Sequence, residues 1–396
     1  MKQHKAIGIV TLCFLFLIML FPVWGNLLPQ GGETSLNEKR DLTPWPSAGS
    51  LNTRIKLISN FIDDRLAFRE PIIAGVLRMD LALGESPHNQ VMIGQDGWLY
   101  YDEGGYSKSD ILRIDRLDQE TLGQIAEAQQ ATEDIFTAAQ TDYRILVAPD
   151  KHTIYPDYLP LNCRQGEGPS ALDEIYQTLG EKTTVKWVDV RPALQAKAGE
   201  TDLYYRTDTH WNSSGAWVAY QALMDALLPE HPEMRKLTEE DVTRSEATFS
   251  GDLAIMIGME NEWIDVFTQV SVKKSAARED PESGLTTWFN DELPEGPHML
   301  LLYDSFGPEL IPFLRESVGA LTLVSNEQFY RSVIGDPEQY DIVIMEVVER
   351  NATWLGSGLE AGSEEDEEEE EESEYLPEFD DEDEPEPEEE EETEDA

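Results

Sequence analysis

One short segment of the chain places an acid and a base at a spacing suited to catalysis. It reads TDTHWNSSGAW and puts Asp208 two residues before His210. In an extended segment, residues two apart point to the same side, so the carboxylate can accept a hydrogen bond from one imidazole nitrogen. The other nitrogen is then free to act as a base toward a hydroxyl group. On their own, the two residues also fit a solvated turn or a segment that caps a helix.

A metal-binding interpretation of the same residues needs a third ligand. The pattern Asp-x-His suits zinc or iron, and His152 in the segment APDKHTIYP is the candidate for the third position. The folded part of the sequence offers no second compact cluster of histidine and acidic residues. We therefore expect neither a metal nor another cofactor.

A serine follows a buried strand farther along the chain. The apolar run of MLLLYDSFG ends in Asp304-Ser305-Phe306-Gly307, and a helix is expected to begin near Pro308. Ligands of open α/β sheets bind outside the carboxyl ends of the strands. The free N–H groups of a helix start can also stabilise a developing oxyanion. Ser305 is therefore a candidate nucleophile, and the alternative is a serine that caps the helix.

The elements that must position these residues alternate between strands and helices. Hydrophobic runs predict buried strands at residues 143–149, 186–190, 298–306, 320–324 and 340–349. Two further short strands are expected around a turn at Asp96-Gly97. The helical periodicity predicts helices at residues 52–68, 115–140, 191–198, 213–228 and 307–317.

Ser213 or Ser214 is expected to cap the helix over residues 213–228. Strands that alternate with helices favour a parallel sheet covered by helices on both faces, so we predict an α/β fold. Residues 232–295 show no clear period and are left unassigned.

The N-terminus carries an apolar run long enough to cross a bilayer. Lys2 and Lys5 precede residues 6–28, which hold no charged side chain. At about 1.5 Å per residue, a helix of this length spans the hydrocarbon layer. The run is longer than the apolar part of a cleaved signal peptide, so we predict a membrane anchor, with a signal segment as the alternative. Its positive end predicts that the rest of the chain is exported to the periplasmic or cell-surface side.

Acidic residues dominate the chain, whose net charge is −51. From Glu360 onward there are 25 acidic residues and no Lys or Arg, which leaves 55 acidic and 29 basic residues and a net charge of −26 elsewhere. An acidic body argues against a nucleic-acid partner, which requires clustered Lys and Arg. We predict a disordered acidic tail over residues 358–396, a linker over residues 29–48 and one folded domain over residues 49–357.

Several short motifs resemble those of a known family. The chain is similar to the SGNH-hydrolase-like proteins of alginate O-acetylation (the AlgJ and AlgX type) and to the related bacterial DHHW proteins. The resemblance covers residues 37–351. In order, its motifs are NEKRDLTPWP with FIDDRLAFRE, IGQDGWLYY, VAPDKHTIYPDYLP, YYRTDTHWNSSGAW, FSGDLA, YDSFG and YDIVIMEVVERN.

The resemblance implies an SGNH-hydrolase-like fold and a role for each residue of a triad. Ser305 would be the nucleophile, His210 the general base and acid, and Asp208 the carboxylate that orients it. The nucleophile motif of the family commonly reads Gly-Asp-Ser, whereas here Tyr303 stands in place of the glycine. The remaining candidates for substrate or oxyanion contacts are Phe306, Asn212, Arg206, Lys151 and Trp211, whose alternative is a structural role.

The function implied by the resemblance is O-acetylation outside the cytoplasm. An acetyl group would pass through Ser305 to a hydroxyl of a secreted or cell-wall polysaccharide. The family suggests a membrane-bound O-acyltransferase partner as the source of the acetyl group, beside which residues 6–28 would hold the chain. The alternatives are a carbohydrate acetyl esterase with the same triad, and a non-catalytic protein that binds or assembles a polysaccharide.

Overall fold

The computed structural model describes residues 86–359, except 103, 115, 282–283 and 326–333, together with single positions between residues 45 and 79. The expected anchor over residues 6–28 lies outside the described residues, as do nearly all of the linker and most of the expected helix over residues 52–68. Of the expected tail over residues 358–396, only Gly358 and Leu359 are described, and Leu359 is buried in the core, so the folded part extends to this residue. Among the helices that are described, none combines the length and the apolar character needed to cross a membrane.

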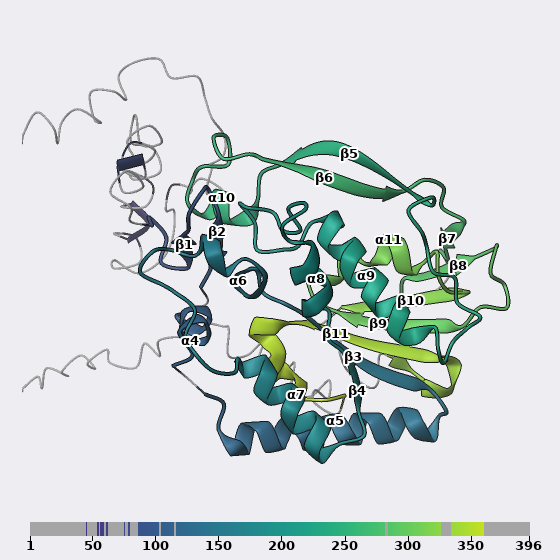
Figure 1. Cartoon of the computed structure of the whole chain (residues 1–396). Helices are drawn as coiled ribbons and strands as arrows, with labels where there is room; N and C mark the ends of the chain where they lie inside the picture. The colour runs from purple at the N-terminus through teal and green to yellow at the C-terminus, as the bar shows by residue number, and fades with distance from the viewer. Residues whose placement is uncertain are drawn as a thin grey trace, which may run out of the picture.

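A seven-stranded sheet forms the centre of the described part (Figure 1). Its strand order is β4–β3–β11–β9–β10–β8–β7. The first five strands run parallel, β8 runs antiparallel to β10, and β7 runs antiparallel to β8. The strands are β3 (Asp142–Ala148), β4 (Lys186–Val188), β7 (Ala277–Glu279), β8 (Thr287–Asn290), β9 (His298–Tyr303), β10 (Ala320–Ser325) and β11 (Ile342–Val348).

The prediction of a parallel sheet is correct for the five strands that were read from buried apolar runs. It is wrong at one edge, where β8 and β7 make the sheet mixed. These two strands are short and contain several polar residues, and only β7 lies at the very edge of the sheet. They lie within the stretch that shows no hydrophobic period in the sequence.

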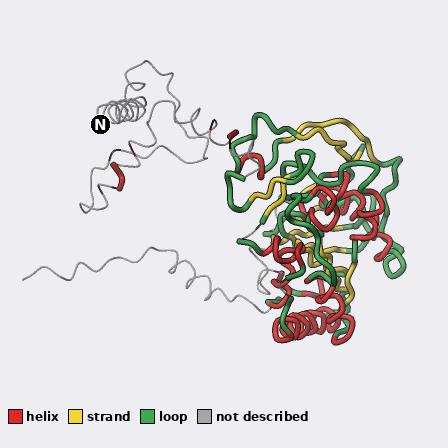
Figure 2. The backbone as a smooth tube through the Cα atoms, turned by 60° about the vertical axis from the view of Figure 1, so that its left-hand side comes forward, coloured by secondary structure: helices red, strands yellow, loops and turns green. Residues whose placement is uncertain are grey.

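Helices cover both faces of the sheet because successive side chains of its strands point to opposite sides. Tyr143, Ile145 and Val147 of β3 belong to the core that contains α5 and α7. Leu146 and Ala148 of the same strand belong to the core that contains α8, α9 and α11. Figure 2 shows α5 and α7 at the lower edge of the molecule and the β5–β6 hairpin at the opposite end. The helices are α5 (Gln119–Ala138), α7 (Ala171–Lys182), α8 (Arg191–Lys197), α9 (Ser213–Leu227) and α11 (Ile311–Leu314).

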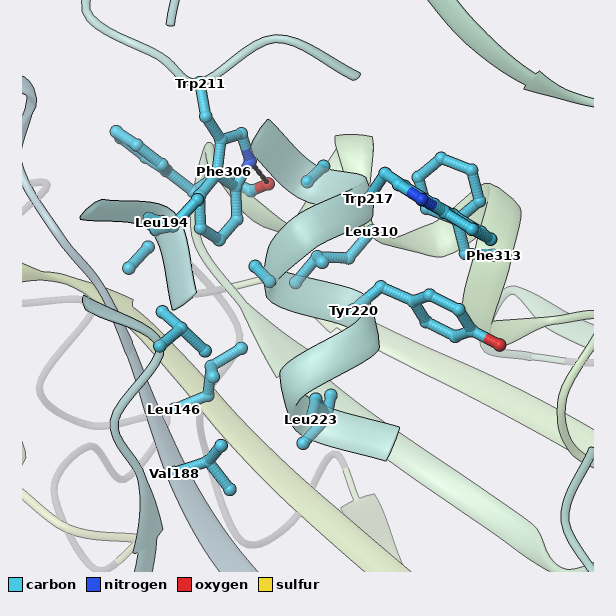
Figure 3. Close-up of a cluster of buried hydrophobic side chains, with 14 of the residues drawn as sticks. Leu146, Val188, Leu194, Trp211, Trp217, Tyr220, Leu223, Phe306, Leu310 and Phe313 are labelled. Atoms are coloured by element: carbon cyan, nitrogen blue, oxygen red, sulfur yellow. Dashed lines mark hydrogen bonds between the residues drawn. The ribbon is translucent and has the colours of Figure 1, made fainter. Parts of the chain in front are cut away.

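The core beside α9 is rich in aromatic rings (Figure 3). Trp217 and Tyr220 of α9 contact Phe313, with ring centroids 5.2 and 5.6 Å apart. Deeper in the layer, Leu223 of the same helix packs in one cluster with Leu146 of β3. This packing fixes α9 on the sheet and therefore fixes the segment that precedes it, which carries the Asp-Thr-His sequence.

The start of α9 differs from the prediction. Its N-cap is Asn212, whose side chain accepts hydrogen bonds from the N–H groups of Ser214 and Gly215 at 2.9 and 3.1 Å. The two serines instead hold the neighbouring strand β6. Ser213 accepts from the N–H of Val270 at 2.9 Å, and Ser214 donates to a carbonyl of β6 at 2.8 Å.

The helix expected over residues 307–317 forms two short pieces. A 3-10 turn, η2 (Gly307–Glu309), precedes the four-residue helix α11. Pro308 and Pro312 each stand in the first turn of one piece, where the lack of an N–H is tolerated. No long helix therefore begins at Ser305, and the expected helix-start contribution to an oxyanion site is not supported.

The remaining elements surround the carboxyl ends of the parallel strands. The predicted pair around Asp96-Gly97 is confirmed as β1 (Val91–Ile93) and β2 (Leu99–Tyr101), with both turn residues at positive φ. A second antiparallel pair consists of β5 (Val242–Phe249) and β6 (Asp265–Val272). The short helices are α4 (Tyr106–Leu112), α6 (Lys151–Ile154) and α10 (Asp252–Met256), and the 3-10 turns are η1 (Pro156–Tyr158), η4 (Pro337–Gln339) and η5 (Glu349–Gly356).

Candidate active site

The carboxyl ends of β9 and β11 meet at Asp304. Its carboxylate accepts from the N–H of Val348 at 2.6 Å and from the N–H of Phe306 at 2.9 Å. Asp304 is buried, and its own N–H donates to Glu346 of β11 at 3.1 Å. The turn that carries Ser305 is therefore held against β11, at the centre of the sheet, through Asp304.

Asp208 and His210 are paired as their spacing predicts. Nδ1 of His210 lies 2.6 Å from Oδ1 of Asp208, which also accepts from the backbone N–H of His210 at 2.9 Å. Asp208 is buried, whereas the His210 side chain is 27% exposed. Nε2 of His210 is buried and has no hydrogen-bond partner among the described residues. The imidazole thus has one nitrogen held by a carboxylate and one nitrogen free.

A second carboxylate lies beside this pair. The carboxylate of Asp252, at the start of α10, accepts from the N–H of Thr209 at 2.9 Å and from its hydroxyl at 2.7 Å. The backbone N–H of Asp252 donates to Oδ2 of Asp208 at 2.8 Å. Gly251 makes this approach feasible, because a Cβ there would stand 2.3 Å from the carbonyl oxygen of Thr207 and 2.5 Å from Cβ of Asp208.

Phe306, the residue after Ser305, connects the turn after β9 to His210. Its ring centroid lies 4.8 Å from that of His210, and its carbonyl accepts from the indole N–H of Trp211 at 3.0 Å (Figure 3). Trp211 and Phe306 are both fully buried. Ser305 itself is exposed, and its side chain hydrogen-bonds to no other described residue. The exposed serine thus adjoins the residue that packs on His210.

Two of the expected oxyanion donors are engaged elsewhere. The N–H of Phe306 donates to Asp304, so it is not free for a ligand. Asn212 is fully buried, caps α9 with its oxygen and donates its amide nitrogen to the carbonyl of Asp202 at 2.8 Å. Among the described residues, the N–H of Ser305 has no hydrogen-bond acceptor and is the remaining backbone candidate.

Lys151 holds the segment of residues 202–212, here called the catalytic segment, through backbone carbonyl groups. Its ammonium group is buried and donates to the carbonyl oxygens of Tyr205, Arg206 and Asp208 at 2.9, 3.2 and 2.6 Å. Burial lowers the pKa of Lys151 to about 7, while the charge of Asp208 acts in the opposite direction. Three acceptors match the three N–H bonds of the charged form. This placement does not support substrate binding by Lys151 and indicates a structural role.

Arg206 and Trp211 also have partners within the fold. The half-exposed guanidinium of Arg206 pairs with Asp202 at 2.9 Å and lies 5.5 Å from the ring centroid of Trp98. Trp211 is buried between the Asp-Thr-His segment and Phe306. Of the five residues expected to contact substrate or oxyanion, only Arg206 thus keeps its functional group at the surface.

The carboxyl groups around His210 differ in the direction in which their environment shifts their pKa values. Burial would raise the pKa of Asp208, but the hydrogen bond and charge of His210 lower it to about 2. Burial and the charge of Asp208 raise the pKa of Asp252. Burial also raises the pKa of Glu309 in η2, although the charge of His210 opposes this shift. Asp208 therefore stays ionised over the pH range in which an imidazole titrates.

Gly307 compensates for the tyrosine that precedes Asp304. A Cβ on Gly307 would lie 2.5 to 2.7 Å from three atoms of the Tyr303 side chain, closer than real contacts allow. The departure of this chain from the Gly-Asp-Ser motif is thus accommodated by the absence of a side chain at position 307. Tyr303 and Gly307 form a matched pair on the two sides of Ser305.

We expect Gly307→Ala to displace the Ser305 turn and to destabilise the protein by about 1–3 kcal/mol, the usual range for overpacking. The change in unfolding free energy would be measured with denaturant. Gly123→Ala, at a position in α5 where a Cβ meets nothing, serves as the control and should not destabilise. In a Tyr303→Gly background, Gly307→Ala should lose most of its cost, and an undiminished cost would contradict the pairing.

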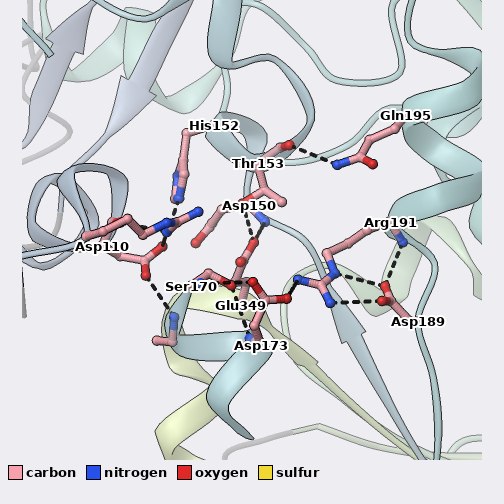
Figure 4. Close-up of polar contacts among 12 residues, drawn as sticks. Asp110, Asp150, His152, Thr153, Ser170, Asp173, Asp189, Arg191, Gln195 and Glu349 are labelled. Carbon is pink, nitrogen blue, oxygen red and sulfur yellow. Dashed lines mark hydrogen bonds and ion pairs between the residues drawn. The ribbon is translucent and has the colours of Figure 1, made fainter. Parts of the chain in front are cut away.

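A second polar cluster lies at the ends of β3 and β11 (Figure 4). Oε2 of Glu349 accepts from the N–H of Asp150 at 2.8 Å and from the hydroxyl of Thr153 at 2.7 Å. His152 lies 3.4 Å from Asp110, and Arg350 pairs with Asp150 at 2.8 Å. Burial raises the pKa of Glu349 to about 7.

Within the described part of the chain, two groups of side chains have donor atoms close enough to share a cation. In each group the three donor atoms lie within 4.8 Å of one another: Asp150, His152 and Glu349 in one, and Asp208, His210 and Asp252 in the other. The expected third ligand for the Asp-x-His pair, His152, therefore belongs to a different cluster. Hydrogen bonds within the chain and the Arg350 guanidinium already engage carboxylate oxygens in these groups. This favours the interpretation of both groups as networks of hydrogen-bonded charges over their interpretation as metal sites.

Asp252 and Thr209 are the contributors to the site that the residue spacing did not reveal. Asp252 lies 44 residues beyond Asp208, so no local pattern connects them. The one available signal was the ordered motif FSGDLA, which contains both Gly251 and Asp252.

Comparison with known proteins identifies the family of this chain. The family described as SGNH hydrolase-like domain, acetyltransferase AlgX matches residues 91–306, which is more than half of the chain and includes Asp208, His210 and Ser305. The chain belongs to this family, and the resemblance seen in the motifs is confirmed. The described sheet and its helices have the corresponding SGNH-like α/β fold.

Curated proteins that are similar to this chain are named for one activity, alginate O-acetylation. A protein of Pseudomonas syringae pv. tomato named probable alginate O-acetylase AlgJ is 26% identical over 188 residues, which are 46% of this chain and 45% of the relative. The protein of the same name from Pseudomonas fluorescens is 22% identical over 320 residues, 72% of this chain and 77% of the relative. The chain spans less than half the length of the first two curated relatives that it matches.

Solved structures give the same group of names. The O-acetyltransferase domain of Pseudomonas putida AlgJ aligns with a TM-score of 0.44 and 16% identity, covering 67% of this chain and 97% of that chain. A DHHW family protein from Eubacterium siraeum aligns with a TM-score of 0.48 and 16% identity, covering 68% of this chain and 100% of that chain.

Proposed function

We propose that this protein is an O-acetyltransferase that uses Ser305, His210 and Asp208 as nucleophile, base and orienting carboxylate. The observation that carries the proposal is the arrangement of His210. Its Nδ1 lies 2.6 Å from Asp208, and its buried Nε2 has no partner among the described residues. Ser305 is exposed and precedes Phe306, whose ring centroid lies 4.8 Å from that of His210.

The proposed reaction has two halves. In the first, Oγ of Ser305 attacks the acetyl carbonyl while Nε2 of His210 takes the hydroxyl proton, which then passes to the leaving group of the donor. In the second, His210 takes the proton of an acceptor hydroxyl, whose oxygen attacks the acetyl-serine and displaces Oγ, and the proton then returns from Nε2 to Oγ of Ser305. Asp208 stabilises the imidazolium in both halves, and the N–H of Ser305 is the proposed oxyanion donor.

The acceptor is proposed to be a polysaccharide hydroxyl, because relatives of this chain are named alginate O-acetylases. A membrane-bound O-acyltransferase is the proposed source of the acetyl group, and residues 6–28 are the proposed anchor beside it on the extracytoplasmic side. The proposed organisation keeps residues 29–48 as a linker, 49–357 as the folded domain and 358–396 as an acidic extension.

An acetyl esterase with the same triad is the second candidate. The observation that favours it is the exposure of Ser305 together with the 27% exposure of the His210 side chain, since water can then reach the acyl-enzyme. Transfer requires the acceptor hydroxyl to react faster than water. Both candidates share the acetyl-serine intermediate, so its detection tests them against a non-catalytic binding protein.

The test is to trap that intermediate. The purified protein is mixed with p-nitrophenyl acetate, quenched in acid and digested, and the peptides are examined by mass spectrometry. We expect one acetyl group on the peptide that contains Ser305, together with release of p-nitrophenol. Ser245→Ala, at an exposed serine of β5, is the matched control and should keep both signals.

Ser305→Ala should lose the acetylated peptide and the rapid release of p-nitrophenol. Equal release from this variant and the unmodified protein would refute the nucleophile. Adding an oligosaccharide acceptor then separates the two candidates, since a transferase acetylates the sugar whereas an esterase releases only acetate.

A further inference from the structure

We propose that Asp252 and Thr209 form a second arm, beside Asp208, that fixes the tautomer of His210 in its basic form. The inference rests on the proposed function in that it concerns the same imidazole. It goes beyond it by assigning positioning roles to two residues outside the Ser305–His210–Asp208 set. Both are positioning residues, since each acts through hydrogen bonds within the chain.

The arm is a chain of three groups. The hydroxyl of Thr209 donates to Oδ2 of Asp252 at 2.7 Å, and the oxygen of the same hydroxyl lies 3.0 Å from Nδ1 of His210. Oδ1 of Asp252 accepts from the N–H of Thr209 at 2.9 Å. Both oxygens of the carboxylate are therefore used to hold one threonine.

The direction of these bonds follows from counting protons. A carboxylate can only accept, and a hydroxyl has a single proton, so donation from Thr209 to Asp252 leaves the hydroxyl oxygen with lone pairs toward His210. The Thr209 oxygen is then an acceptor for Nδ1–H. A proton on Nδ1 leaves a lone pair on Nε2, and Nε2 must carry this lone pair to act as the base.

The carboxylate of Asp208 alone does not fully fix this tautomer, because its oxygens also accept from other donors. Its Oδ1 is shared between Nδ1 and the backbone N–H of His210, and its Oδ2 accepts from the N–H of Asp252. A second acceptor for Nδ1–H therefore adds to a contact that is already divided. Both acceptors, Asp208 and Thr209, lie at Nδ1 of His210. Together they disfavour the alternative tautomer, in which Nε2 carries the proton.

The arm is rigid because α10 is tied to the catalytic segment at several points. The N–H of Ala254 donates to the carbonyl of Thr207 at 3.1 Å, and the N–H of Gly251 donates to the Thr207 hydroxyl at 3.1 Å. Thr209 is 8% exposed, so water competes little for its hydroxyl. The other charged group that acts on His210 is Glu309 of η2, on the segment that carries Ser305.

Three variants separate the arm from a merely structural role. Asp252→Asn is nearly isosteric but can present an NH₂ group to Thr209, which turns the hydroxyl proton toward Nδ1 and opposes the basic tautomer. Thr209→Val removes the hydroxyl and leaves Asp208 to act alone. Thr209→Ser keeps the hydroxyl and should preserve the arm.

The direct test reads the proton itself by NMR of the full chain labelled with ¹⁵N-histidine, with the His210→Gln spectrum to assign the signal. We expect neutral His210 in the unmodified protein and in Thr209→Ser to carry its proton on Nδ1. Asp252→Asn should move the ¹⁵N shifts toward protonation at Nε2. An unchanged Nδ1–H signature in Asp252→Asn would overturn the proposal whatever the activity of the protein.

Kinetics with the activated ester provide the second readout. We expect Asp252→Asn to lower kcat by about 10- to 100-fold at neutral pH, within the range of general-base effects, and Thr209→Ser to retain near-normal kcat. In the Thr209→Val background, Asp252→Asn should have little further effect, because both changes break one chain of contacts. Independent, additive losses would contradict the arm. A protein inactive even with an intact Ser305 would refute the proposed function but leave the NMR test valid.

Discussion

Asp208→Asn is expected to lower the rate of acetyl transfer by about 10⁴-fold, because an amide no longer selects the basic tautomer of the imidazole or stabilises its charged form. The carboxylate lies 2.6 Å from Nδ1 of His210, and burial excludes water from the contact. The rate of p-nitrophenol release over a range of pH would measure the effect.

The control for this variant is Asp202→Asn. Asp202 belongs to the same segment, pairs with Arg206 and makes no hydrogen bond or ion pair with His210, so its loss should change the rate by less than about threefold. Comparable losses in the two variants would show that the segment had been disturbed generally. They would remove the assignment of Asp208 as the partner of the base.

The same carboxylate has a predictable effect on stability. Its pKa falls from 3.8 to about 2 on folding, so the folded protein binds fewer protons than the unfolded chain between these values. The stabilisation, about 2 kcal/mol, is complete above pH 4 and is lost as the pH falls toward 2. The unfolding free energy of Asp208→Asn should therefore decline less steeply over this interval than that of the unmodified protein.

Lys151→Met is expected to cost about 3–5 kcal/mol of unfolding free energy, more than the change expected for Gly307→Ala. Methionine can occupy the space of the aliphatic stem, but three carbonyl oxygens of residues 205–208 would lose their shared donor in a buried position. Denaturant titration measures the loss. Activity should fall with it, since these carbonyls belong to the segment that leads into His210.

Lys197→Met provides the comparison for that change. Lys197 is half-exposed and pairs only with Glu200 among the described residues, so its replacement should stay within about 0.5 kcal/mol. If Lys151→Met were equally mild, the carbonyls would have found other donors. Lys151 would then not be the support of the catalytic segment.

The sequence was most informative where one physical requirement acted alone. β3, β9 and β11 are buried on both faces, so they read as unbroken apolar runs and were predicted closely. β7 and β8 are an edge pair, and a short edge strand imposes little demand on composition. Their direction depends on contacts with β10 that no local pattern contains.

The candidate site, like the fold, could be predicted from the sequence only where residues close in the chain determine the contact. Asp208 and His210 stand two residues apart, so their spacing predicts their contact, although the chain bends at residues 206–210 instead of running extended. The roles expected for Asn212 and Phe306 failed because each has a stronger local partner: the start of α9 for Asn212, and Asp304 for the N–H of Phe306. Asp252 reaches Thr209 only through the fold, across 43 residues.

Several contacts that hold the catalytic segment come from distant parts of the chain. Lys151 binds it from 57 residues away, Asp265 holds Thr207 from 58 residues away, and Trp211 meets Phe306 across 95 residues. Closing such loops costs entropy before any contact is gained, so the base half of the site forms late in folding. The proposed base and nucleophile therefore come together only when β6, α10 and the end of β9 have docked. Until then, Ser305 would lack the base that is proposed to activate it.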